Sequence, residues 1–212
     1  ADYLILSYAL YHQDMQVPLI AAGDNLSFFP MGFLFRRMGA FFIRRSFKGD
    51  ALYTLVLERY LRNLIKAGHT IEFFIEGGRS RTGRVMRPKL GLLTMVVRAW
   101  ESGACDDLCL SPISINYEKV MEEKSYIREL EGGKKQKESV AGLFKVFGVL
   151  AKRYGRVFVE FAEPISLKSA FGCDAAAFAA KPEGERRAAI KTLGDHIANS
   201  INGVTVVTPS QI

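Results

Sequence analysis

The stretch TIEFFIEGGRSRTGR, from Thr70 to Arg84, decides what kind of fold this 212-residue chain adopts. Its first half, Thr70 to Glu76, is rich in β-branched and aromatic residues, which predicts a β-strand. The glycines that follow permit positive φ angles, so that successive backbone N–H groups can converge on an anion, and each arginine adds a planar donor pair that matches phosphate. We therefore expect a phosphate-binding loop at the carboxyl end of the strand, where open α/β sheets hold their ligands.

The sequence of this loop allows comparison with two other kinds of turn, a nucleotide P-loop and a basic surface turn. Gly78 and Gly83 have the glycine spacing of a nucleotide P-loop, but Arg84 and Val85 stand where Lys and Ser or Thr must hold the phosphates and magnesium. The P-loop is therefore excluded. A solvent-exposed basic turn without a ligand remains the alternative from this stretch alone.

Strand-like and helix-like segments alternate on both sides of the loop. Strands are expected at 18–23, 40–45, 70–76, 108–117 and 156–162, and helices at 3–13, from 30 onward, at 51–67, 92–102, before 154 and at the C-terminal end. In the helix at 51–67, apolar residues recur every three or four positions and predict a stripe on one face: Leu52, Leu55, Val56, Tyr60, Leu61 and Leu64. This alternation predicts an α/β fold with a mixed, largely parallel sheet that helices cover on both faces. Residues 1–212 are expected to form a single domain, with a polar loop at 118–138.

The composition of the chain limits the classes of molecule that it is expected to bind. Twenty-nine Lys and Arg against 22 Asp and Glu leave a net charge of +7, which favours phosphate esters, nucleic acid or an acidic membrane face. The apolar stretches are shorter than the roughly 18 residues that cross a bilayer. The three cysteines lack the second Cys or His pair of a zinc site, so we expect reduced thiols and no metal.

Four blocks of the chain resemble the glycerolipid acyltransferase family. Its first block is His-x-x-x-x-Asp, and Asp2, which begins DYLILSYALYHQ, matches the acid. GAFFIRR (39–45) resembles the second block, FIEGGRSR (74–81) the third, and Pro112 in SPISINYEK the fourth. The order and spacing hold from Asp2 to about Pro164. The third block with its TGR…RPK tail is similar to the glycerol-3-phosphate branch of the family, not the lysophosphatidate branch.

The histidine of the first block belongs five positions before Asp2, which lies upstream of residue 1. None of the histidines present replaces it, because no Asp follows five residues after His12, His69 or His196. We expect these three on the surface or in packing roles. We also expect the domain to continue before residue 1 and after residue 212, and the fragment alone to be inactive or severely impaired.

The resemblance implies transfer of a fatty acyl group from a thioester, acyl-CoA or acyl carrier protein, to the sn-1 hydroxyl of glycerol 3-phosphate. Neither a metal nor a further cofactor is implied. Asp2 would hold the imidazole that takes the proton of the attacking hydroxyl. Glu76 is the second expected catalytic acid, and its place beside the arginine cluster is typical of a carboxylate that orients guanidinium groups. The expected substrate-binding residues are Arg45, Gly77, Arg79, Ser80, Arg81 and Pro112.

Residues 28–48 mix seven phenylalanines with five Lys or Arg. This mixture fits either core packing with a solvated face or a surface that enters the headgroup layer of an anionic membrane. We expect peripheral attachment to the cytoplasmic face of the inner membrane. Two alternatives stay open: an acyltransferase for dihydroxyacetone phosphate or lysophosphatidate, and a basic nucleic-acid-binding module. Because the arginines cluster at one turn and not along a helix face, nucleic acid is not the expected partner.

Overall fold

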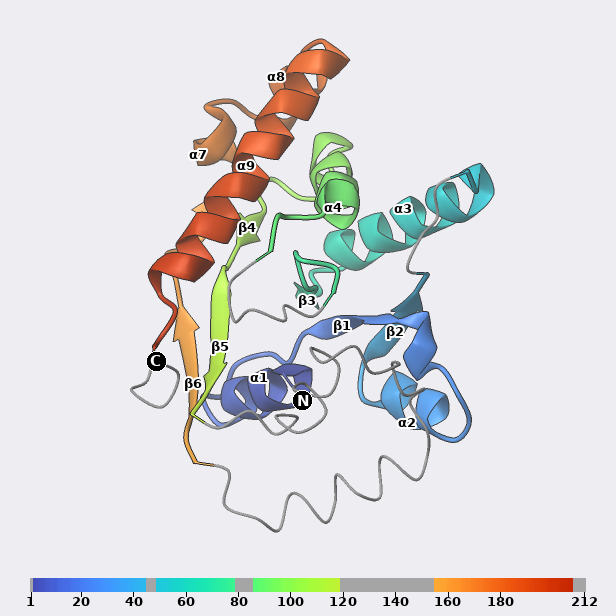
Figure 1. Cartoon of the computed structure of the whole chain (residues 1–212). Coiled ribbons are helices and arrows are strands. Elements are labelled where there is room, and N and C mark those ends of the chain that lie inside the picture. The colour runs from blue at the N-terminus through green and yellow to red at the C-terminus, as the bar shows by residue number, and fades with distance from the viewer. Residues whose placement is uncertain (1, 45–48, 79–85, 119–154, 208–212) are drawn as a thin grey trace, which may run out of the picture.

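A three-stranded parallel sheet lies at the centre of the N-terminal half (Figure 1). The computed structural model describes residues 2–44, 49–78, 86–118 and 155–207. The strand order in this sheet is β2 (Ala40–Ile43), β1 (Leu19–Gly23), β3 (Ile71–Glu72). Ile20 of the middle strand lies opposite both Ala40 and Glu72. The inner residues of β1 are buried, as a parallel strand covered on both faces requires.

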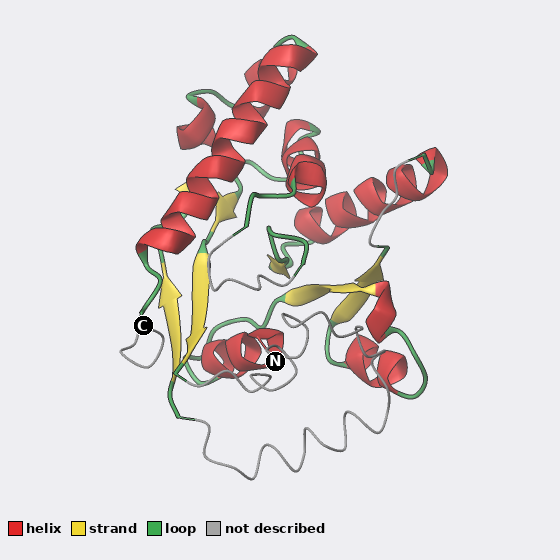
Figure 2. Cartoon of the chain, viewed as in Figure 1, coloured by secondary structure: helices red, strands yellow, loops and turns green. Residues whose placement is uncertain are grey.

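Helices cover both faces of this sheet (Figure 2). On one face lie α1 (Asp2–Tyr11), the short 3-10 turn η1 (Asp24–Leu26) and α2 (Met31–Arg37), and on the other lie α3 (Ala51–Lys66) and α4 (Leu90–Glu101). On the first face the rings of Tyr3 and Phe35 meet edge-on, with their centroids 6.0 Å apart. On the second face Ile71 packs against Leu57 and Leu61 of α3.

The C-terminal half adds two antiparallel strand pairs and a long helix. Its elements are β4 (Cys109–Leu110), β5 (Ile113–Tyr117), β6 (Val157–Phe161), β7 (Ile165–Ser166), α7 (Leu167–Phe171), α8 (Ala175–Ala179) and α9 (Glu183–Gly203). β4 pairs with β7, and β5 pairs with β6. The core of this half gathers around Trp100, Leu167 and Phe178, which are fully buried.

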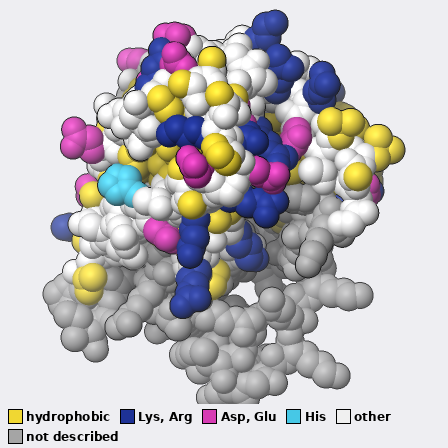
Figure 3. Space-filling view, turned by 90° about the horizontal axis from the view of Figure 1, so that it is seen from above, with side chains coloured by type: hydrophobic (Ala, Val, Ile, Leu, Met, Phe, Trp, Pro, Cys, Tyr) yellow, Lys and Arg dark blue, Asp and Glu magenta, His cyan; other side chains and the backbone are white. Residues whose placement is uncertain are grey.

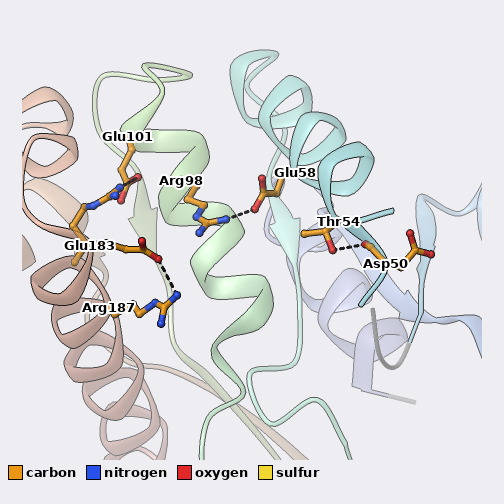
Figure 4. Close-up of polar contacts among 8 residues, drawn as sticks. Asp50, Thr54, Glu58, Arg98, Glu101, Glu183 and Arg187 are labelled. Carbon is orange, nitrogen blue, oxygen red and sulfur yellow. Dashed lines mark hydrogen bonds and ion pairs between the residues drawn. The ribbon is translucent and has the colours of Figure 1, made fainter. Parts of the chain in front are cut away.

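Helix α4 joins the two halves because it packs against α3 on one side and α9 on the other. Two ion pairs border these contacts (Figure 4): Arg98 of α4 binds Glu58 of α3 at 2.7 Å, and Arg186 of α9 binds Glu101 of α4 at 3.0 Å. Gly194 permits the close approach of α9, since a Cβ there would come within 2.5 Å of Leu90 Cδ2. Helix α4, which follows the glycine-rich loop in the chain, is therefore packed between α3 and α9.

The predicted α/β class with helices on both faces of a parallel sheet is confirmed. The strands, however, form three separate sheets among the described residues. The strand expected at 70–76 pairs only over 71–72, because the chain turns after Phe74 and the Gly77 N–H bonds the Phe74 carbonyl. The strand expected at 108–117 divides around Pro112, which has no N–H to donate to a ladder, and its two parts pair with different partners.

Helix α3 was predicted with nearly its observed bounds, but its buried face differs from the predicted stripe. Leu57 and Leu61 are buried, whereas Leu52, Leu55 and Val56 are exposed. These exposed residues belong to the N-terminal end of α3, and hydrophobic side chains are visible over this end at the right edge of Figure 3. The helix predicted before 154 and most of the polar loop predicted at 118–138 lie outside the described residues.

Candidate acyl-transfer site

Asp2 lies in the first turn of α1, and its carboxylate accepts a hydrogen bond from the Tyr117 hydroxyl at 2.5 Å. Tyr117 is the last residue of β5, so this contact joins the start of α1 to the end of a strand in the C-terminal half. A hydrogen bond to an ionised acceptor is short and strong. It fixes Oδ1 of Asp2 in one direction.

Glu72 of β3 belongs to the same region. Burial raises the pKa of Glu72, the negative charge of Asp2 raises it further, and the resulting value is about 7. Its Oε2 atom is buried and has no hydrogen-bond partner among the described residues. Burial is the larger of the two causes, because an apolar environment disfavours the charged form of a carboxyl group.

An apolar pocket of about 180 Å³ lies between α1 and the sheet. Tyr3 and Leu4 line it from α1, Ile20 and Ala22 from β1, and Phe35 from α2. Tyr3, one of the lining residues, directly follows Asp2 in the chain. Asp2 itself is not among the lining residues. A mostly apolar cavity of this kind suits the hydrocarbon part of a ligand.

The glycine-rich loop is held at both ends by contacts that do not involve its arginines. The Met86 N–H donates to Glu76 Oε2 at 3.0 Å, and the Lys89 N–H donates to the Ile75 carbonyl at 2.8 Å. Gly77 has φ of +56°, and a Cβ on it would lie 2.7 Å from Lys89 Cδ. Glu76 thus helps to close the loop by accepting a hydrogen bond from its backbone. The arginines that it is expected to orient lie outside the described residues, so that role stays a prediction.

The remaining predicted residues divide into two groups. Arg45, Arg79, Ser80 and Arg81 lie outside the described residues, so their expected convergence on a phosphate stays a prediction. Pro112 is buried, and its carbonyl accepts the Ala162 N–H at 2.9 Å beside the β5–β6 pair. The residue of this strand that reaches Asp2 is Tyr117, five positions further on.

Arg44, which alternation along the strand separates from Arg45, has partners of its own. It forms an ion pair with Asp50 at 2.8 Å and stacks over the ring of Tyr53 at 4.6 Å. These contacts tie the end of β2 to the start of α3, which supports a structural role for Arg44.

All three histidines are exposed, as expected for residues without a catalytic partner. His12 packs against the ring of Tyr8, with a centroid distance of 4.2 Å. Within the described parts of the chain, no three His, Cys, Asp or Glu side chains are grouped so that they could hold a metal ion. Across those same residues, none of the helices is long and apolar enough to span a bilayer.

Sequence reasoning missed Glu72 and Tyr117. A signal for Glu72 was present, because it is the one charged residue inside the apolar run from Ile71 to Ile75, and an acid in a buried strand needs a partner or a raised pKa. Tyr117 carried no comparable signal. Its role depends on β5 ending beside α1, and no local pattern predicts that.

Two family models match this chain. Residues 1–116 match the family model described as acyltransferase, and residues 126–212 match the model described as glycerol-3-phosphate acyltransferase C-terminal region. Since the first match covers more than half of the chain and includes Asp2 and the glycine-rich loop, the chain belongs to the acyltransferase family.

Relatives named glycerol-3-phosphate acyltransferase are similar over much of the chain. The protein of Pseudoalteromonas translucida is 50% identical over 166 residues, that of Aeromonas hydrophila 51% over 170, and that of Pseudomonas putida strain GB-1 40% over 214. These alignments cover 78%, 79% and 98% of this chain but only 20%, 21% and 26% of the relatives. The chain thus spans about a fifth to a quarter of their length.

Proposed function

We propose that the protein containing this chain transfers a fatty acyl group from acyl-CoA or acyl carrier protein to the sn-1 hydroxyl of glycerol 3-phosphate, the first step of phospholipid synthesis. The observation that carries the proposal is the Asp2 carboxylate, which Tyr117 holds in the first turn of α1, the helix that also lines an apolar pocket. The similarity to relatives named glycerol-3-phosphate acyltransferase supports the choice of acceptor. The proposed reaction needs no metal and no cofactor besides the thioester.

In the proposed mechanism, a histidine five positions before Asp2 takes the proton of the acceptor hydroxyl as its oxygen attacks the thioester carbonyl. Such general-base assistance contributes roughly 10² to 10⁴ in rate. Asp2 orients the imidazole and stabilises the imidazolium ion. The C–S bond then breaks, and the imidazolium returns the proton to the departing thiolate, so no acyl-enzyme forms.

Substrate binding is proposed to use the loop after β3. Arg45, Arg79 and Arg81 bind the phosphate dianion, and Ser80 with the Gly77 backbone adds donors beside them. The Glu76–Met86 contact supports this role, because it holds the two ends of the loop together. The apolar lining of the pocket under α1 suits the hydrocarbon of the acyl donor.

We further propose that the protein lies peripherally on the cytoplasmic face of the inner membrane, with α2 and its neighbours toward the lipid. Phe29 is 87% exposed and Phe33 60%, and the Arg37 guanidinium lies 4.3 Å from the ring of Phe33. Exposed aromatic side chains next to cations suit an anionic lipid interface. A flotation assay with anionic vesicles should show binding that weakens in high salt, and absence of binding at low and high salt would oppose this placement.

The reaction is tested with the full-length protein expressed from its complete gene. Radiolabelled glycerol 3-phosphate and palmitoyl-CoA should yield labelled lysophosphatidate, and Asp2→Asn should lower kcat by about 10³ or more, since a triad acid replaced by its amide loses about 10⁴. Competition with dihydroxyacetone phosphate or lysophosphatidate identifies the acceptor. Wild-type activity in Asp2→Asn would overturn the proposed role of this acid.

A nucleic-acid titration serves as the check on the non-enzyme alternative. Proteins that bind nucleic acid through basic residues bind less tightly as the salt concentration rises. Filter binding of the same protein to duplex and single-stranded DNA should show no such salt-dependent, saturable binding. Tight binding together with absence of acyl transfer would favour the alternative.

A further inference from the structure

We propose that the apolar pocket beneath α1 binds one hydrocarbon chain, and that Ala22 and Ala40 determine how much of the chain fits. The ligand class is a single-chain amphiphile with an anionic head, either a fatty acid or a fatty acyl thioester. Binding of the hydrocarbon can be measured without acyl transfer. Only its consequence, a preference for acyl donors of certain chain lengths, rests on the function proposed above.

The floor of the pocket is the α1 face of the parallel sheet. Successive side chains of a strand point to opposite faces, so Ile20 and Ala22 of β1 share this face, and both line the pocket. Ala40 of β2 lies opposite Ile20 in the register and lines the pocket as well. Protein interiors are close-packed, so larger side chains at the two alanine positions would fill the space. The small size of Ala22 and Ala40 therefore keeps the pocket open.

The size and the lining of the pocket suit a hydrocarbon. Its volume is about 180 Å³, and none of the described residues that line it is charged. In another protein, an apolar cavity of about 150 Å³ stays dry and binds benzene. At about 30 Å³ for a group the size of a water molecule, this pocket takes a run of about six methylene groups. The rest of a longer chain, and the head group, must then lie outside it.

The mouth of the pocket lies among exposed apolar residues. Leu4, Val17 and Met38 line the pocket and are exposed, whereas Ile20 and Phe35 line it and are buried. The helices α1 and α2, which contribute Leu4 and Phe35, lie on the same side of the sheet (Figure 1). A chain can therefore enter between the exposed residues and end against the buried ones.

Helix α2 places cations on the same side of the sheet. Arg36 and Arg37 directly precede Met38 and are exposed, and neither forms an ion pair with any acid in the described part of the chain. The Arg36 guanidinium lies 5.5 Å from the ring centroid of Phe42, which is opposite Ala22 in the register. These cations complement a ligand whose tail enters the pocket and whose anionic head stays at the surface.

Photocrosslinking tests hydrocarbon binding directly. A palmitate analogue with a diazirine at its methyl end is added to the full-length protein in its membrane, and the labelled peptides are mapped after irradiation. The label should appear in peptides that contain the lining residues of β1 and α2, and excess unmodified palmitate should prevent it. Labelling confined to other peptides, or labelling that palmitate does not reduce, would overturn the proposal.

Two neighbouring alanines of β1 provide a matched pair of variants. Ala22→Ile adds three carbons to the floor and should lower the labelling by about tenfold or more, because each methylene group kept out of the pocket costs about fourfold in affinity. Ala21 is equally buried but does not line the pocket. Ala21→Ile should therefore leave the labelling unchanged. Normal labelling in Ala22→Ile contradicts the proposal.

A second pair at the surface covers the case in which added bulk in β1 prevents folding. Met38 and Leu34 are 46% and 47% exposed near the end of α2, but only Met38 lines the pocket. Met38→Gln keeps the length of the side chain and should lower the labelling about threefold, whereas Leu34→Gln should not. Equal labelling in the two variants would show that the surface of α2, and not the pocket, holds the chain.

The kinetic arm compares acyl-CoA donors of increasing chain length in the full-length protein. Ala22→Ile and Ala40→Ile should each shift the optimum of kcat/KM to chains about three carbons shorter and leave the KM for glycerol 3-phosphate unchanged, while Ala21→Ile keeps the wild-type optimum. An unchanged optimum in the first two variants contradicts their role in chain length. Absence of acyl transfer in the wild-type protein instead contradicts the proposed function, and crosslinking then still decides whether the pocket binds hydrocarbon.

Discussion

The Tyr117 hydroxyl binds the Asp2 carboxylate across 2.5 Å, although 115 positions separate the two residues in the chain. This contact places the end of β5 at the start of α1. It gives the expected catalytic acid a defined direction before any substrate binds, and such preorganisation is what an orienting carboxylate contributes to catalysis.

Loss of this contact should reduce turnover more than binding. In the full-length protein, Tyr117→Phe is expected to lower kcat about tenfold while the KM for glycerol 3-phosphate changes little, because a hydrogen bond to a charged group is worth about 1.5 to 3 kcal/mol. Steady-state kinetics measure both values. Tyr8→Phe is the matched control, since Tyr8 is 67% exposed. Equal loss of kcat in both variants would show that the Tyr117–Asp2 contact is not responsible.

Two features favour glycine at position 77: its positive φ and the contact that a Cβ would make there. Gly68 shares only the first feature, so a comparison of the two positions distinguishes their effects. Gly77 and Gly68 both have positive φ, but only at Gly77 would a Cβ meet another atom, Lys89 Cδ. Each Gly→Ala variant should lose about 1 to 2 kcal/mol of stability from the strained backbone, as urea unfolding measures. Gly77→Ala alone should also raise the KM for glycerol 3-phosphate, by about threefold. The same KM in both variants would remove Gly77 from the substrate loop.

Two substitutions of Glu76 distinguish a role in holding the loop from a role in proton transfer. Glu76→Ala removes the acceptor of the Met86 N–H, so it should raise the KM for glycerol 3-phosphate about tenfold and leave the KM for the acyl donor unchanged. Glu76→Gln keeps an amide oxygen as acceptor and should be milder. If Glu76→Gln abolishes kcat instead, Glu76 acts in the chemistry and the loop contact is secondary.

Glu72 also makes the stability of the 212-residue chain depend on pH. Its pKa is raised from 4.5 to about 7 in the folded protein, so the stability it contributes is fully present below pH 4.5 and is lost as pH rises through 7. Glu72→Gln cannot ionise, and it should unfold at higher urea than wild type at pH 8, by on the order of 1 to 3 kcal/mol, with little difference at pH 4.

The control for this prediction is Glu183→Gln, which alters an exposed ion pair with Arg187. That variant should keep the wild-type pH dependence, because exposed pairs contribute about 1 kcal/mol or less. A parallel pH dependence for Glu72→Gln and wild type would mean that Glu72 ionises normally in the folded chain.

Much of the architecture was accessible from local patterns. The periodicity of α3, the strand LIAAG and the acid-glycine sequence at the end of the third strand predicted elements that the structure contains. Local patterns succeed here because backbone preference and side-chain burial act over a few residues. Local patterns did not predict which residues of α3 are buried. Leu52 and Leu55 match the helical period but are exposed, because the spacing of apolar residues does not determine which of them contact the core.

By itself, the sequence determined the α/β class and the place of the glycine-rich loop after a strand, and its resemblance to a family predicted Asp2 as the acid of the site. Only the tertiary structure decided that Tyr117 and Glu72 accompany Asp2, that Glu76 binds the Met86 backbone, and that the strands divide into three sheets. The physical reason is that a hydrogen bond or a charge interaction depends on distance in space. Chain folding brings together residues 10 to 115 positions apart, and no local pattern in the sequence records which of them will meet.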